Sequence, residues 1–343
     1  MKHLFAILAA VIFAAGLGFA QSNTATVTQT VNESQATANQ TGSTNTAAIS
    51  QTGSMDYNDA ALINQTGDHN TAGVTTVGSY NSVQYDLIHS FGYGVYTFDL
   101  DGITQTGNLN SSTVNQSGSF QWTGISQLSN SNTAEVSQSG SEFFYSNTAG
   151  IIQSGGDLNS VTILQDGIDG ESYVLQHGGS NTANVQQHQN IGGFYYGGLS
   201  EVVQDGSNNS AVQNQTGSLD AYDGSSVVAQ VFQVGSTNFA VQYQNGGSNT
   251  SMITSIGTGN GVLGDEIKTD QTGTGNSASI EEGLLSAVNS NLASVLQTGD
   301  MNSAAVSHEG GNSNIARVSQ TSDSNTANVS QVGSNNSASV AQH

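Results

Sequence analysis

Asn325-Thr-Ala327-Asn-Val329-Ser-Gln331 is followed, after the turn Val-Gly333-Ser-Asn, by Asn336-Ser-Ala338-Ser-Val340-Ala-Gln342. The same short pattern is therefore written twice, with Asn, Ala, Val and Gln at every second position. Alternate residues of a β-strand point to one face, so these four residues point one way and the small polar residues between them point the other. A helix would place Ala and Val on opposite sides. The pattern predicts a strand, then a Gly-containing turn, then another strand.

The unit recurs along nearly the whole chain at a spacing of about eleven residues, which is typical of a repeat architecture. Stacking one unit on the next brings Asn over Asn and Gln over Gln. Buried amides are costly unless they are hydrogen-bonded, and in such a stack each has a partner above and below. We predict inward-facing structural ladders that include Asn45 and Gln51, Asn132 and Gln138, Asn147 and Gln153, Asn181 and Gln187, Asn291 and Gln297, Asn325 and Gln331, and Asn336 and Gln342.

A single strand of this kind cannot bury its one apolar face, but two consecutive units can face each other as strand-turn-strand. The expected fold is all-β, a β-solenoid of stacked layers of about 22 residues each, of the cross-β or amyloid type. We expect a secretory signal peptide at 1–20, because Lys2 and His3 precede a short apolar run and a small-residue cleavage site. The solenoid then spans 21–343, with irregular insertions near 85–102, 189–198, 219–224, 258–265 and 283–289.

The composition excludes several classes of protein. The chain has no Cys and no Pro, and its net charge is -22 with three Lys and Arg in all. A chain of this negative charge is repelled by nucleic acid and by anionic lipid, so a nucleic-acid binder and a protein that docks on such lipid are both excluded. No segment after the expected signal peptide is apolar enough to insert into a membrane. The first and last strands resemble the interior ones and carry no blocking charge or Pro, so we expect them to pair with further copies of the chain.

No catalytic, metal or cofactor site is predicted. The Asp-Gly pairs are irregularly spaced and indicate turns rather than calcium sites, and the His residues are scattered; His308 takes the place of a Gln in its unit. The Thr residues that follow the Asn positions would form an outward row, but the next outward position along the strand does not hold a second Thr. A solvent-exposed face is therefore favoured over an ice-binding face. The aromatic runs Phe143-Phe144-Tyr145 and Phe194-Tyr195-Tyr196 leave two interpretations open, which are binding to sugars or surfaces and packing over the solenoid.

Gln40-Thr-Gly42-Ser-Thr-Asn45-Thr-Ala47-Ala-Ile-Ser-Gln51 matches the pattern Gln-x-Gly-x-x-Asn-x-Ala-x3-Gln. In this pattern the chain resembles the curlin repeat family, the subunits of bacterial curli fibres, over nearly all of 23–343. The chain is much longer than a typical five-repeat member and lacks the Gly-rich N-terminal arm of that family.

The resemblance implies a non-enzymatic subunit of extracellular amyloid fibres on the surface of a Gram-negative bacterium, supporting adhesion and biofilm. It also implies export through an outer-membrane secretion pore and nucleation by a companion subunit. The alternative hypothesis is a secreted, monomeric β-solenoid that acts as an adhesin or binds ice.

Overall fold

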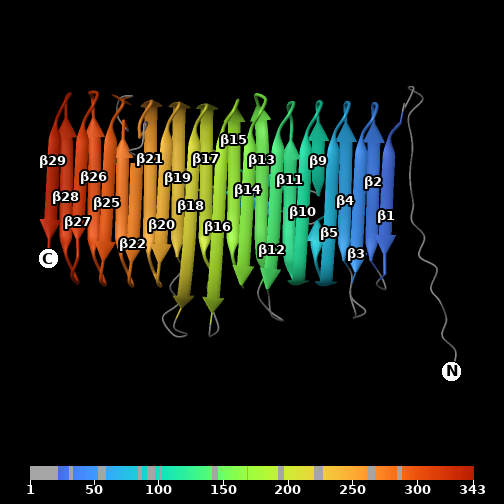
Figure 1. The fold of residues 1–343 in the computed structure, drawn as a ribbon, viewed down its shortest axis with the longest axis horizontal. Coiled ribbons are helices and arrows are strands. Elements are labelled where there is room, and N and C mark those ends of the chain that lie inside the picture. Colours follow the sequence, from blue (N-terminus) through green and yellow to red (C-terminus); the bar gives the residue numbers. More distant parts are fainter. Residues whose placement is uncertain are drawn as a thin grey trace. The chain divides into compact units, whose positions relative to one another are not determined.

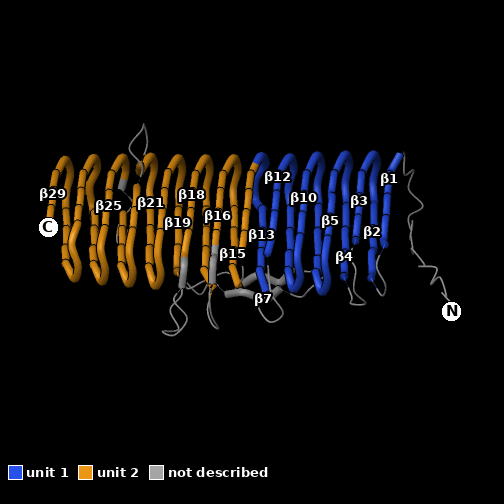
Figure 2. Tube along the Cα trace, turned by 60° about the horizontal axis from the view of Figure 1, so that its bottom comes forward, with its two compact units in different colours: residues 1–158 blue, residues 159–343 orange. Residues whose placement is uncertain are grey.

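The computed structural model describes residues 22–30, 34–52, 59–83, 87–90, 97–100, 102–140, 146–167, 169–191, 197–219, 227–261, 267–283 and 288–343. The predicted signal peptide lies outside the described residues. The chain divides into two compact units, Met1–Leu158 and Asn159–His343, coloured separately in Figure 2. Each unit is made of parallel strands that alternate along the chain between two sheets, here sheet A and sheet B, and no helix occurs among the described residues (Figure 1).

Within unit 1, five strands follow one another in each sheet. In sheet A the order is β1 (Thr24–Gln29), β3 (Thr46–Thr52), β5 (Thr71–Ser79), β10 (Ser111–Ser119) and β12 (Thr133–Gly140). In sheet B it is β2 (Gln35–Thr41), β4 (Ala60–Thr66), β6 (Ser82–Val83), β11 (Gln121–Gln127) and β13 (Asn147–Gly155). A short strand, β9 (Ile103–Thr106), completes the layer of β6, because both pair with β4 and with β11.

The insertion near 85–102 separates β6 from β9. Within it, β7 (Leu87–Ser90) and β8 (Thr97–Leu100) pair in antiparallel fashion, and β8 contacts β11 and β13. One strand of the solenoid is thus interrupted by a hairpin and then resumed in register, since Ala60 pairs with Ser82 and Ile63 with Ile103.

Unit 2 has longer sheets of the same kind. Sheet A runs β14 (Ser160–Gly167), β16 (Thr182–Ile191), β18 (Ser210–Leu219), β20 (Phe239–Asn245), β22 (Ile267–Thr272), β25 (Leu292–Thr298), β27 (Ile315–Gln320) and β29 (Ser337–Gln342). Sheet B runs β15 (Glu171–Gly178), β17 (Leu199–Ser207), β19 (Val228–Ser236), β21 (Thr250–Thr258), β23 (Ser277–Glu282), β26 (Ser303–Glu309) and β28 (Thr326–Val332), with β24 (Val288–Asn289) also pairing with β21.

The predicted β-solenoid is confirmed, with a longer average turn than expected. Equivalent Asn residues are 22 residues apart in the shortest turns but 40 apart across the β7–β8 insertion and 31 apart in one turn of unit 2. The mean is about 26 residues per turn. The layer of about 22 residues is therefore the unit without insertions. The added residues lengthen turns or, at β7–β8, interrupt a strand, and the strand register is kept.

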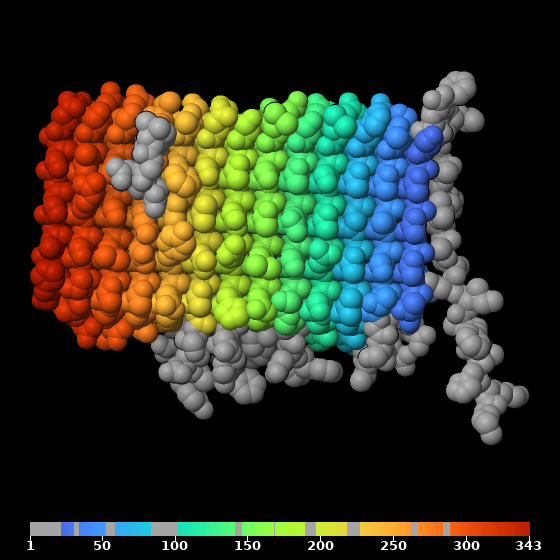
Figure 3. Space-filling view, viewed as in Figure 1, coloured from blue at the N-terminus to red at the C-terminus, as the bar shows by residue number. Residues whose placement is uncertain are grey.

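The core follows the period-two pattern of the repeat. Inward Ala and Val or Ile side chains of both sheets are buried, as at Ala47, Ile49, Ala316 and Val318, whereas the intervening side chains are exposed or half-buried. A fully buried Val or Ile contributes roughly 1.5–3 kcal/mol, so the repeated aliphatic stripe stabilises the packing of each layer on the next. On the face seen in Figure 3, equivalent side chains of successive strands form rows that run across the strands.

The turns use two residues with positive φ. Gly206 (φ 127°) lies so close to the next layer that a Cβ on it would overlap the carbonyl oxygen of Gly235. Two residues later Asn208 adopts the left-handed conformation (φ 56°) immediately before the ladder residue Asn209. This explains why Gly stands three residues before the ladder Asn in many units of the repeat.

Candidate functional site: the amide ladders and the end strands

The Gln residues form continuous columns of side-chain hydrogen bonds. In sheet A of unit 2 the column runs through Gln165, Gln187, Gln215, Gln244, Gln271, Gln297, Gln320 and Gln342, and each Nε2 donates to the Oε1 of the next at 2.7–3.1 Å. In sheet B of unit 1 the column runs through Gln40, Gln65, Gln105, Gln127 and Gln153. Every bond points the same way along its column, toward the C-terminal layers.

The second N–H of each Gln amide crosses the core to a backbone carbonyl of the other sheet. Gln187, for example, donates to the Glu171 carbonyl at 3.0 Å as well as to Gln215. Both N–H groups of the amide are therefore used, and a hydrocarbon side chain of similar size would leave several buried partners unmatched.

The Asn columns are bonded differently from the side-chain ladder that the sequence suggests. Oδ1 of Asn45 accepts the backbone N–H of Asn70 at 2.9 Å, and its Nδ2 donates to the Gly67 carbonyl at 2.7 Å. The same bonds join Asn181 to Asn209 and Gly206. Asn is short and lies at the corner of the turn, so it reaches the backbone of the next layer rather than the next amide.

All the predicted ladder residues lie on inward rows of their strands. Asn45, Gln51, Asn132, Gln138, Asn147, Gln153, Asn181, Gln187, Asn291, Gln297 and Gln331 are buried, and Asn325, Asn336 and Gln342 are half-buried. The structure brings together members of one column, such as Gln297 with Gln320 and Gln342, and keeps the Asn and Gln columns apart. The last three residues are half-buried because they belong to β28 and β29 or to the turns before them, at the end of the stack.

Hydroxyl groups in Ala positions also join the Gln columns, which the sequence pattern did not reveal. Ser172 Oγ donates to Gln187 Oε1 at 2.7 Å, and Thr123 Oγ1 donates to Gln138 Oε1 at 2.8 Å. The signal available in the sequence was a Ser or Thr two residues after the turn corner, where other units have Ala.

Two interruptions replace a ladder amide with an ionisable group. In unit 1, Asp59 stands where an Asn is expected and accepts hydrogen bonds from the Asn81 backbone N–H and from Thr76 Oγ1, which itself stands in a Gln position. Asp59 is fully buried, and this burial raises the pKa of its carboxyl although both hydrogen bonds act in the opposite direction. The Thr in the Gln position thus supplies a hydrogen bond to the Asp in the Asn position.

In unit 2, Glu282 of β23 and His308 of β26 occupy successive Gln positions of sheet B. Both side chains are fully buried, and His308 Nδ1 lies 3.3 Å from Glu282 Oε1 without a well-aligned hydrogen bond. Burial raises the pKa of the Glu282 carboxyl, and the nearby His308 acts in the opposite direction. The neighbours in the column are Ser255 and Gln331, neither of which titrates in this range.

The described residues contain no group of three or more His, Asp or Glu side chains placed to hold a metal ion. No helix among them is long and apolar enough to cross a membrane. The aromatic runs near 143 and 194 lie outside the described residues.

The outermost described strands, β1 and β29, differ from the interior strands of sheet A. Among the residues that the structure describes, β1 pairs only with β3, and β29 pairs only with β27. Their inward residues, such as Val27 and Val340, are half-buried, whereas the equivalent residues of interior strands are buried. Within the described part of the chain, the outer edge of each of these strands has no backbone partner, and it carries part of the apolar stripe and the last amide of a column.

Residues 289–321 match the family model of the Curlin associated repeat. This segment carries the curlin repeat. The matched segment contains β25, β26 and β27 with their turns, so the curlin repeat corresponds to successive strand-and-turn units of the solenoid. No curated protein matches the chain. The curlin repeat and the β-solenoid together point to a structural protein and fit a curli-like structural subunit.

Proposed function

We propose that the chain is the structural subunit of extracellular, curli-like functional amyloid fibres that grow by end-to-end stacking of copies. The observation that carries the proposal is the complementarity of the two end strands. Gln320 donates both to the Ser303 carbonyl and to Gln342, whereas within the described part of the chain Gln342 donates only to the Thr326 carbonyl and retains one N–H. At the other end, Gln29 donates to Gln51 at 2.6 Å, and its own Oε1 receives no ladder bond within the described residues.

The Asn columns end in the same complementary way. Asn336 donates its N–H to Asn314 Oδ1, which leaves its own Oδ1 for the backbone N–H of an Asn23 in a second copy. Stacking β29 of one copy on β1 of the next would therefore extend the Asn column and the Gln column with the bonds found inside the chain. The parallel backbone ladder and the Ala and Val stripe would continue as well.

Charge favours this contact over others. The chain carries a net charge of -22, yet β1, β2, β28 and β29 contain no Asp, Glu, Lys or Arg. Copies that meet by other faces bring carboxylates together, whereas copies that meet by these strands do not. Natural proteins usually block exposed edges with charges or Pro.

The resemblance extends the proposal to the surroundings of the fibre. A fibre of this kind supports adhesion and the biofilm matrix outside a Gram-negative cell. Its partners are further copies of the chain, a nucleating subunit and an outer-membrane secretion pore, with no nucleic acid and no membrane insertion.

The test is assembly of purified chain 21–343 in the presence of an amyloid-binding dye. We expect a lag, then insoluble fibres with cross-β spacings of roughly 4.8 and 10 Å, and loss of the lag on seeding with preformed fibres. A solution that stays monomeric for days at high concentration, with or without seeds, would leave the monomeric adhesin or ice binder as the better hypothesis.

A further inference from the structure

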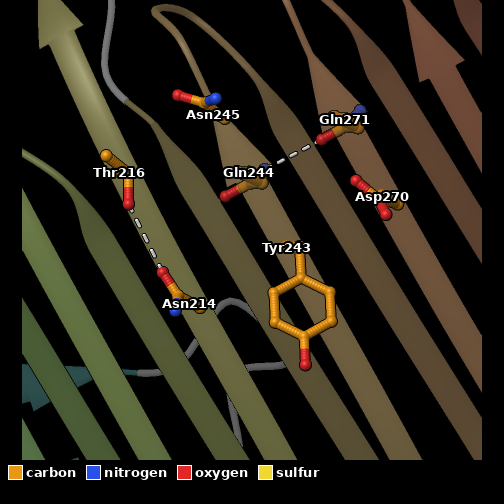
Figure 4. A pocket seen from close by; sticks show the side chains of 7 residues that line it. All are labelled: Asn214, Thr216, Tyr243, Gln244, Asn245, Asp270 and Gln271. Carbon is orange, nitrogen blue, oxygen red and sulfur yellow. Dashed lines mark hydrogen bonds between the residues drawn. The ribbon is translucent and has the colours of Figure 1, made fainter.

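A shallow hollow lies on the outer face of sheet A in unit 2, where β18, β20 and β22 run side by side (Figure 4). Its volume is about 210 Å³. Tyr243 lies between its two register partners, Asn214 on β18 and Asp270 on β22. Thr216 and Asn245, two residues further along their strands, complete the outward-facing lining.

Tyr243 is unusual among the outward aromatic side chains of the described strands because it is exposed. Trp122, Tyr173, Phe232 and Phe239 also stand at outward positions but are buried or half-buried, whereas Tyr243 remains 39% exposed. Lys268 Nζ lies 5.1 Å from the centroid of the ring and 3.3 Å from Asp270 Oδ2. The cation–π contact and the ion pair hold the ring and the carboxylate side by side.

The use of Lys268 here is notable because basic side chains are so rare. Lys268 and Arg317 are the only Lys and Arg of the described residues, in a chain of net charge -22. Lys268 offsets the charge of Asp270, so the hollow combines an apolar ring face with hydrogen-bonding groups and has little net charge of its own.

This combination selects a class of ligand. A pyranose ring has an apolar C–H face that packs on an aromatic ring, and hydroxyl groups around its rim that need donors and acceptors. Asp270 accepts, Asn214 and Asn245 both donate and accept, and the carboxylate gives the stronger, charge-assisted bonds. The volume is below the roughly 300–1,000 Å³ of pockets for drug-sized ligands, which suits one sugar ring at a time. The acidity of the chain disfavours uronates and sulfated sugars.

We propose that this hollow binds one hexopyranose unit of a neutral polysaccharide, with the sugar ring stacked on Tyr243 and its hydroxyls bonded to Asp270 and the flanking amides. One such open site binds weakly on its own. In a fibre the sites repeat once per copy, and a polysaccharide chain that spans several of them binds much more tightly. That gain rests on the proposed function, whereas binding by a single copy does not.

The first experiment uses the soluble, unassembled chain and saturation-transfer NMR with cellohexaose and maltohexaose as neutral probes and a hexamer of galacturonate as the anionic one. We expect binding of at least one neutral probe and none of the anionic probe. Tyr243→Ala should weaken neutral-probe binding at least tenfold, and Asp270→Asn should weaken it severalfold. Tyr243→Phe, which keeps the ring, should bind within about threefold of wild type.

Leu164→Ala is the matched control, since Leu164 lies in the same outward row two strands from Asn214 and is 41% exposed. It should leave binding unchanged. Absence of neutral-probe binding by the wild-type chain, or equal binding by Tyr243→Ala with an unchanged circular dichroism spectrum, would overturn the proposal. Dye-detected assembly of the Tyr243→Ala variant is measured in parallel, because fibre formation should not depend on this ring.

Discussion

A side-chain amide in this protein has a different role on each face of its strand. Gln187 is buried and receives hydrogen bonds from Gln165 and Ser172 while donating to Gln215. Its neighbour Gln186 is exposed and has one weak contact of 3.4 Å with Asn214. The inward amide is part of the core, and the outward amide is surface.

Replacement of the inward amide should therefore be costly. We expect Gln187→Leu to lower the free energy of unfolding by about 2–4 kcal/mol, because more than one buried polar group loses its partner at about 1–3 kcal/mol each. Gln186→Leu should change it by less than about 0.5 kcal/mol, as for most surface substitutions. Urea unfolding of freshly purified chain measures both, and equal effects at the two positions would contradict the ladder energetics.

The buried Glu282–His308 contact predicts a pH dependence. Burial raises the pKa of the Glu282 carboxyl above its ordinary value of 4.5. Between the unfolded and folded pKa values, the folded chain holds a proton that the unfolded chain has released. The stability contributed by this group is therefore fully present below the unfolded pKa and declines as pH rises through the folded pKa.

Glu282→Gln restores an uncharged amide to the column. We expect this variant to be more stable than wild type at pH 8 by about 1–3 kcal/mol, since it removes a buried carboxylate that has no aligned hydrogen bond, and to be similar to wild type at pH 4. Glu281→Gln, on the outer face of the same strand, should keep the wild-type dependence. Urea unfolding midpoints measured from pH 4 to pH 8 compare the three proteins. If the midpoint of Glu282→Gln changes with pH as much as that of wild type, the pH dependence arises from another group.

At the scale of the strand and its turn, the close approach of successive layers makes the turn Gly essential. Gly206→Ala would place a Cβ against the Gly235 carbonyl and force a left-handed backbone that L-residues disfavour by about 1–2 kcal/mol. We expect a loss of at least about 2 kcal/mol. Gly73→Ala is the control, because a Cβ there meets nothing within 4 Å, and it should be neutral or mildly stabilising. Thermal unfolding separates the two, and similar melting temperatures would contradict the steric argument.

The strands and the stacked architecture were predictable from the sequence because the same pattern, alternating inward and outward residues followed by a turn, recurs in too many units to arise by chance. Register across an insertion was not predictable. Nothing in the sequence shows that the strand broken after Val83 resumes at Ile103 over the same neighbour. The Glu282–His308 contact was missed for a related reason. Each residue is visible as a Gln replacement, but their contact follows only once alternate units are known to be adjacent layers.

The Asn bonding was also missed, because the sequence gives the position of an amide but not its reach. Asn and Gln both recur at inward positions, and both were expected to bond amide to amide. At the turn corner the backbone of the next layer is nearer than the next side chain, so the shorter Asn bonds to backbone.

For the whole molecule, the proposed assembly can be tested at one backbone group. The N–H of Ile315 donates to the Asn336 carbonyl and that of Thr321 to the Gln342 carbonyl. Bonding alternates along a strand, so the N–H of Ser339 points away from β27, toward the site of the next copy.

Ser339→Pro deletes that N–H, which Pro can do on an edge strand at little cost to the chain itself. We expect seeded elongation to slow at least tenfold while the unfolding free energy changes by less than about 1 kcal/mol. Ser339→Thr keeps the N–H and should elongate as wild type does. Wild-type elongation by Ser339→Pro would show that copies do not join through β29.

Because every Gln amide in a column points the same way, each column is a row of aligned dipoles. Their sum leaves partial positive charge at the donor end and partial negative charge at the acceptor end, as in an α-helix. In the proposed fibre these columns would run in one direction, so its two tips would be chemically distinct, and we expect them to grow at different speeds.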